Sequence, residues 1–60
     1  MTSAELQKIE DDAYKNYRSY RMLEIAETNE VDRKIYKDIW QTSAEIIKQV
    51  TTIRTNTAND

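Results

Sequence analysis

The sequence predicts an all-α protein, and three observations support this. The 60 residues include no glycine and no proline, the two residue types that most often mark turns and strand ends. On either side of residues 27–32, apolar residues recur at three- and four-residue steps, which is the spacing of one helix face. A third of the residues are charged, which is typical of helices with one face in water. We therefore predict an antiparallel two-helix hairpin, with helices over about residues 3–27 and 30–55.

The first helix should begin at residues 2–5, which read Thr-Ser-Ala-Glu. In this capping box Thr2, or equally Ser3, accepts from a helix amide and Glu5 reaches back. Asp11 can pair with Lys15 one turn further on, as an ordinary surface feature. The residues predicted to form the apolar side of this helix are Leu6, Ile9, Ala13, Tyr17, Tyr20 and Leu23.

Asn16 admits two interpretations. In strict heptads Asn16 and Glu27 also fall on the apolar side, and a buried Asn can fix the register and oligomeric state of packed helices. In the alternative, Asn16 lies at the edge and Tyr17 covers the apolar side.

A tight turn is predicted within residues 27–32. Thr28 and Asn29 are good N-cap residues, and Asn also tolerates the left-handed conformation that ends many helices. Asp32 lies three residues after Asn29, at the position of a capping-box acid. With no glycine in the turn, we expect Asn29 or a neighbour to adopt the left-handed conformation. The alternative is one continuous helix in a long coiled coil.

The second helix carries the wider apolar stripe, which suggests burial against more than one neighbour. Its members are Ile35, Tyr36, Ile39, Trp40, Ser43, Ile46, Ile47, Val50 and Ile53. Residues 42–45 repeat Thr-Ser-Ala-Glu, so a helix restart there, giving three helices, is an alternative. Residues 55–60 lack apolar periodicity and should fray.

A single hairpin domain over residues 1–60 cannot cover this stripe. A chain of this size buries only ~60% of its unfolded surface and is marginally stable alone. We therefore predict a homodimer of hairpins in a four-helix bundle, with coverage by a different protein as the alternative.

The composition argues against catalysis, cofactors and metals. Histidine and cysteine are absent, which removes the usual general base and the common zinc ligands. The consecutive acids 10–12 point about 100° apart on a helix and cannot converge on one cation. No enzyme activity, cofactor, metal or small-molecule substrate is expected.

Two binding functions remain. The first hypothesis is a regulator, adaptor or inhibitor that binds another protein through an apolar and aromatic helix face, where Tyr and Arg are enriched at binding hot spots. The residues predicted for this interface are Tyr17, Tyr20, Leu23, Tyr36, Ile39, Trp40 and Ile47.

The alternative is an RNA- or DNA-binding regulator of the helical-hairpin dimer type. Tyr14, Lys15, Arg18 and Arg21 alternate aromatic and basic residues on the first helix, and cations on phosphates with tyrosines stacked on bases would bind a single strand. This hairpin-dimer architecture is similar to that of small plasmid RNA-binding copy-number regulators, as a fold analogy without a shared motif. The net charge of −2 is weak evidence against it.

The composition also supports expectations about where the protein is located and what kind of genome encodes it. No apolar run approaches the ~18 residues of a membrane span, and the start does not read as a signal peptide. We expect a cytoplasmic protein without membrane contact. Its size and lack of glycine and proline would suit a phage or mobile-element protein.

Overall fold

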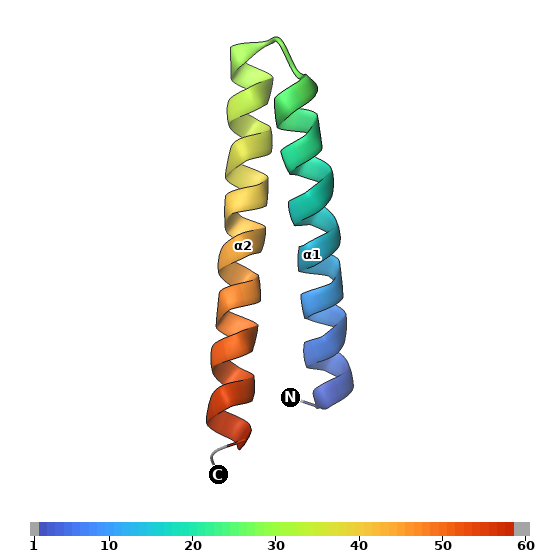
Figure 1. Ribbon diagram of the computed structural model, residues 1–60, viewed down its shortest axis with the longest axis vertical. Coiled ribbons are helices and arrows are strands. Elements are labelled where there is room, and N and C mark those ends of the chain that lie inside the picture. Colours follow the sequence, from blue (N-terminus) through green and yellow to red (C-terminus); the bar gives the residue numbers. More distant parts are fainter. Residues whose placement is uncertain (1, 59–60) are drawn as a thin grey trace.

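The computed structural model describes residues 2–58, which form two helices packed side by side as an antiparallel hairpin (Figure 1). Helix α1 spans Ser3–Ala26 and helix α2 spans Glu30–Ala58. The hairpin is 47 Å long and only about 15 Å wide, with the turn at one end and both chain ends at the other. The predicted all-α hairpin is confirmed, and the continuous-helix alternative is wrong.

Helix α1 begins with the predicted capping box. The Thr2 hydroxyl oxygen accepts from the Glu5 amide at 3.1 Å, so Thr2 and not Ser3 is the N-cap. The Glu5 carboxylate in turn accepts from the Thr2 hydroxyl at 3.1 Å. The first bond satisfies one of the free amides at the helix start, and in the second Glu5 reaches back to the Thr2 hydroxyl rather than to the Thr2 backbone N–H.

The turn consists of Glu27, Thr28 and Asn29, and side chains hold it together. One carboxylate oxygen of Glu27 accepts from the amides of Thr28 and Asn29, each at 3.0 Å. The Asn29 side-chain oxygen accepts from the amides of Val31 and Asp32, which makes Asn29 the N-cap of α2.

The prediction of a left-handed residue in this turn is wrong. Glu27 leaves α1 in an extended conformation, with φ −84° and ψ 135°, and no residue of the described chain has a positive φ. The reason is that a side chain supplies the acceptor. The Glu27 carboxylate takes up the two free turn amides, so no left-handed residue is needed to satisfy them.

Helix α2 is continuous, so the three-helix alternative is wrong. The hydroxyls of several of its threonine and serine residues donate to the carbonyl four residues earlier, a bond that these side chains form within a continuous helix. The donors are Thr42, Ser43, Thr51, Thr52 and Thr55. Helix α2 continues past the predicted end at residue 55, to Ala58. Residues 59 and 60 of the predicted tail lie outside the described residues.

The core between the helices is small. Its buried apolar residues are Leu6, Ala13 and Val50, joined by the buried Ser43. Aromatic pairs extend it toward the turn, with Tyr17 edge-on to Trp40 and Tyr20 tilted against Tyr36, at ring-centre distances of 5.7 and 5.9 Å. The hairpin is therefore closed mainly by aromatic packing in its turn half.

Candidate functional site

The two helices meet along a defined set of positions, which we call the hairpin interface. All its members are buried or half-buried and recur at alternating steps of three and four residues. They are Leu6, Glu10, Ala13, Tyr17, Tyr20 and Glu24 on α1, and Tyr36, Trp40, Ser43, Ile47, Val50 and Arg54 on α2.

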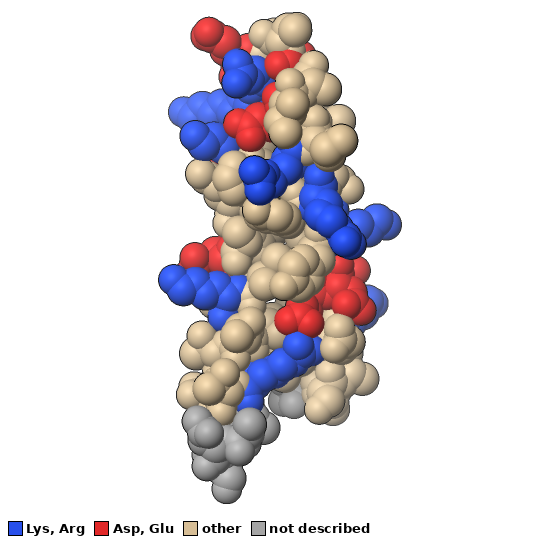
Figure 2. Space-filling model, in the orientation of Figure 1, with Lys and Arg blue, Asp and Glu red and all other residues tan. Residues whose placement is uncertain are grey.

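Two carboxylates lie within this interface in place of predicted apolar residues. Glu24 accepts a 2.7 Å hydrogen bond from the Trp40 indole N–H. Glu10 accepts from Arg54 at 2.7 Å, and the same guanidinium donates to the Gln7 side-chain oxygen at 2.9 Å. Figure 2 shows such basic and acidic side chains in contact across the lower half of the visible face.

These polar contacts correct the predicted apolar side of α1. Ile9 and Leu23 were expected to face α2, yet both are exposed, because α1 is turned so that Glu10 and Glu24 reach their partners on α2. Asn16 is exposed while Tyr17 is half-buried, which confirms the interpretation that places Asn16 at the edge of the hairpin.

Beside the hairpin interface, the protein has a second surface. It is formed by residues that directly precede the contacting residues on each helix. Positions 10, 17 and 24 of α1 contact positions 40 and 54 of α2 on one side of the hairpin. The preceding residue on each helix is rotated by about 100°, toward the opposite side. Because both helices turn in the same sense but run antiparallel, these preceding residues lie on one common face. We call this surface the isoleucine face, and it consists of Ile9, Asn16 and Leu23 from α1 with Ile39, Ile46 and Ile53 from α2.

The isoleucine face is apolar and accessible. Ile9, Leu23 and Ile53 are exposed, and Ile39 and Ile46 are half-buried. Ile35 and Val31, nearer to the turn on α2, are exposed as well. Large apolar side chains gathered on one face of a small protein are typical of an interaction site.

The predicted protein interface divides into two groups. The aromatic residues Tyr17, Tyr20, Tyr36 and Trp40 pack within the hairpin, together with Ile47, and are half-buried there. Leu23 and Ile39 instead lie on the isoleucine face. The sequence prediction did not include Ile9, Ile46 and Ile53 in this interface, although the seven-residue spacing of Ile39, Ile46 and Ile53 is visible in the sequence.

The residues predicted to bind nucleic acid also fall into two groups in the structure. Tyr14, Lys15 and Arg18 are exposed on α1. The Arg21 guanidinium instead lies over the rings of Tyr17 and Trp40, at 5.5 and 5.3 Å from their centres, and donates to the Tyr17 hydroxyl at 2.7 Å. The expected pair between Asp11 and Lys15 does not form, and Asp11 instead accepts from the Gln7 side-chain Nε2 at 2.8 Å.

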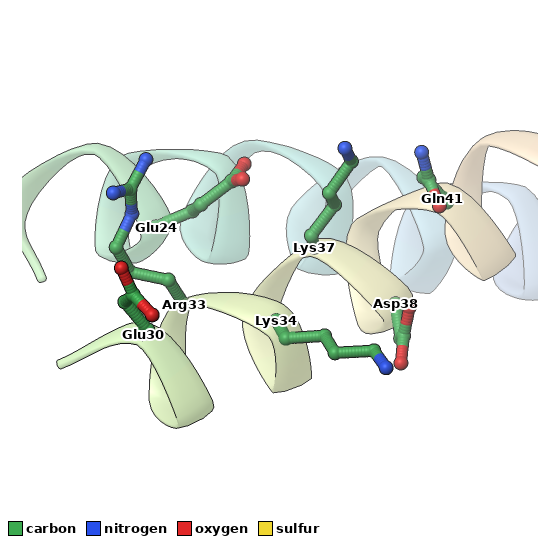
Figure 3. Close-up of a pocket in the computed structure, with 7 residues that line it drawn as sticks. All are labelled: Glu24, Glu30, Arg33, Lys34, Lys37, Asp38 and Gln41. Carbon is green, nitrogen blue, oxygen red and sulfur yellow. The ribbon is translucent and has the colours of Figure 1, made fainter.

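An open groove of about 570 Å³ lies between the helices near the turn, shown in Figure 3. It is lined by Glu24 from α1 and by six residues of α2: Glu30, Arg33, Lys34, Lys37, Asp38 and Gln41. Lys34 extends along α2 toward Asp38, and Lys37 and Gln41 point to the same side of the helix. Three cations and three carboxylates leave this groove without net charge, so it offers little attraction to a phosphate chain.

The described part of the chain contains no cluster of metal-ligand side chains and no helix that could span a membrane. Within residues 2–58 no three acidic side chains gather to hold a metal ion. Neither described helix has an apolar stretch long enough to cross a bilayer.

Comparison with known proteins adds no relative. No protein-family model, curated protein or solved structure matches the chain.

Proposed function

We propose that the protein is a small non-catalytic interaction protein, an adaptor or regulator that acts by binding other polypeptides through its apolar helix surface. The observation that carries this proposal is the isoleucine face. Large apolar side chains are exposed along the whole hairpin, while the buried apolar core consists of Leu6, Ala13 and Val50. Leaving so many large apolar side chains exposed is unfavourable for a chain of this size unless a partner covers them.

The first partner in this proposal is a second copy of the chain. Two hairpins joined through their isoleucine faces form an antiparallel four-helix bundle. A face 47 Å long and 15 Å wide covers roughly 700 Å², close to the ~800 Å² per partner of a standard stable interface. Asn16 lies in the middle of this face, where a polar residue helps to fix the register of the two copies at some cost in stability.

A non-catalytic role fits the chemistry of the interior. Histidine and cysteine are absent. The two carboxylates at the hairpin interface, Glu10 and Glu24, already accept hydrogen bonds from Arg54 and Trp40. These bonds fix the carboxylates in structural contacts, where they hold the helices together.

Nucleic-acid binding remains the second candidate, because Lys15 and Arg18 are exposed beside Tyr14. Phosphate contacts give an affinity that falls steeply with salt. Titration of a fluorescent single-stranded RNA and of duplex DNA at 20 mM salt tests it. Binding that weakens steeply as salt rises would favour this candidate, and no binding at 20 mM salt would eliminate it.

Two adjacent substitutions test the dimer. Leu23→Glu places a carboxylate on the isoleucine face, whereas Met22→Glu places the same group one residue earlier, on the outer side of α1. We expect Leu23→Glu to be monomeric in sedimentation equilibrium and Met22→Glu to retain the dimer mass. Equal masses for the two variants would contradict the assignment of the isoleucine face as the dimer interface.

A further inference from the structure

The outer side of α1 near the turn carries a second surface, which we call the α1 groove. It is a shallow, open depression of about 420 Å³, lined by Tyr17, Arg18, Arg21, Met22 and Ile25. These residues all belong to the last turns of α1. They lie apart from Leu23 and the rest of the isoleucine face, so the proposed dimer would leave the α1 groove open.

The α1 groove contains two of the most exposed large apolar side chains that the structure describes. Met22 and Ile25 are 69% and 76% exposed, whereas Leu23 between them is 45% exposed. Neither side chain contributes to the hairpin interface. Methionine is unbranched and polarizable, so it adapts to differently shaped apolar partners. Two such residues one helical turn apart offer an apolar strip that a partner side chain can cover.

The rim of the α1 groove is cationic and its charge is not neutralised. Arg18 forms no hydrogen bond or ion pair with any other residue that the structure describes. Arg21 is held by the Tyr17 and Trp40 rings and by the Tyr17 hydroxyl. Glu24, the carboxylate one turn further along α1, accepts from the Trp40 indole. The lining therefore contains two cations and no acid.

We propose that the α1 groove binds an amphipathic helix of a partner protein, one whose apolar ridge is flanked by carboxylates. The ridge would cover Met22 and Ile25, and the carboxylates would pair with Arg18 and Arg21. Helix-in-groove binding uses this combination of an apolar strip and charged edges. Arg21 is already positioned by aromatic rings, so less side-chain entropy is lost on binding.

The apolar floor favours a protein helix over a nucleic acid. A nucleic acid strand would gain from the two arginines but would leave Met22 and Ile25 against water or against charged phosphates. Apolar burial at these two positions supplies affinity only to a partner with apolar side chains. The groove of Figure 3 carries no net charge, so the positive charge of the rim does not extend into it. A phosphate chain would therefore find only a short stretch of positive charge.

The inference rests on the proposed function and specifies its partner. In the proposed dimer two α1 grooves lie on one particle, so a partner with two such helices would bind with increased avidity. The hairpin alone is sufficient for one groove, because every lining residue comes from α1. Loss of the dimer and loss of groove binding can therefore be measured separately.

The test uses a synthetic helical peptide with a leucine ridge flanked by glutamates, and its counterpart with lysines in place of the glutamates. Binding is followed by amide chemical shifts of the labelled full chain and by calorimetry. We expect the glutamate peptide to bind and to shift amides around residues 17–25, and the lysine peptide not to bind. Met22→Glu and Arg18→Glu should each weaken binding about tenfold or more, in line with loss of a hot-spot contact.

Two control variants show whether weaker peptide binding comes from the α1 groove itself, from a general charge effect or from loss of the dimer. Lys34→Glu makes the same charge change on α2, outside the α1 groove, and should leave the affinity unchanged. Leu23→Glu should be monomeric but bind the peptide with the same affinity per chain. No binding of the glutamate peptide, binding that Met22→Glu and Arg18→Glu leave unchanged, or stronger binding of a single-stranded RNA at the same amides would overturn the proposal.

Discussion

Replacing Trp40 by alanine should cost about 3 kcal/mol of unfolding free energy. Truncating a fully buried Trp or Phe costs ~3–5 kcal/mol of unfolding free energy. Because Trp40 is only half-buried, the cost from lost apolar burial falls to about 2 kcal/mol. The lost contacts with Tyr17 and Glu24 add about 1 kcal/mol, since the released Glu24 carboxylate regains water.

This cost is large for the chain. Sixty residues correspond to ~3–9 kcal/mol of total stability by the usual value per residue, so the variant should lose much of its helix content at 25 °C. Urea unfolding followed by far-UV circular dichroism measures it, at one protein concentration because a dimer's stability depends on concentration. Trp40→Phe is the matched control, which keeps a ring and loses the indole N–H, and should cost about 1–2 kcal/mol.

A loss below about 1 kcal/mol for Trp40→Ala would refute the reasoning. It would mean that the aromatic pairs in the turn half contribute little, and that the small core of Leu6, Ala13 and Val50 closes the hairpin without them.

Three further predictions concern caps, polar groups and charge. Asn29→Ala should cost about 1 kcal/mol in urea unfolding, because the amides of Val31 and Asp32 lose their acceptor, and an unchanged midpoint would show that the cap is dispensable. Ser43→Ala should be neutral or should stabilise the fold by up to ~0.5 kcal/mol. Alanine is the better helix former, and the Ile39 carbonyl loses only its extra bond from the Ser43 hydroxyl. A loss of stability above about 1 kcal/mol would show that the hydroxyl has a larger role. Arg54→Ala should cost about 1 kcal/mol at low salt and less at 0.5 M salt, because the ion pair joins the 15% exposed Glu10 to an Arg54 side chain that is 38% exposed and open to screening by salt. A cost that is the same at both salt concentrations would attribute it to packing.

Local signals in the sequence predicted the helices and the turn. The Thr2 capping box and the Asn29 cap both lie where their spacing places them, because capping depends on residues only two or three positions apart. The lapse in apolar spacing between the two helices marks the turn for the same reason.

The rotation of α1 about its own axis could not be predicted in this way. It depends on contacts between residues far apart in sequence, Glu24 with Trp40 and Glu10 with Arg54. Apolar periodicity assigns Ile9 and Leu23 to the interior, but the aromatic and charged partners on α2 bring the carboxylates there instead. The wide stripe on α2 did indicate correctly that one partner helix cannot cover it, since Ile35 and Ile53 stay exposed.

The central claim is that a second copy of the chain covers the isoleucine face. The mass of the free protein in sedimentation equilibrium tests it most directly. We predict about 14 kDa, twice the 7.1 kDa of one chain, with dissociation into single hairpins on dilution. A fully helical particle of 7.1 kDa at every concentration would contradict it.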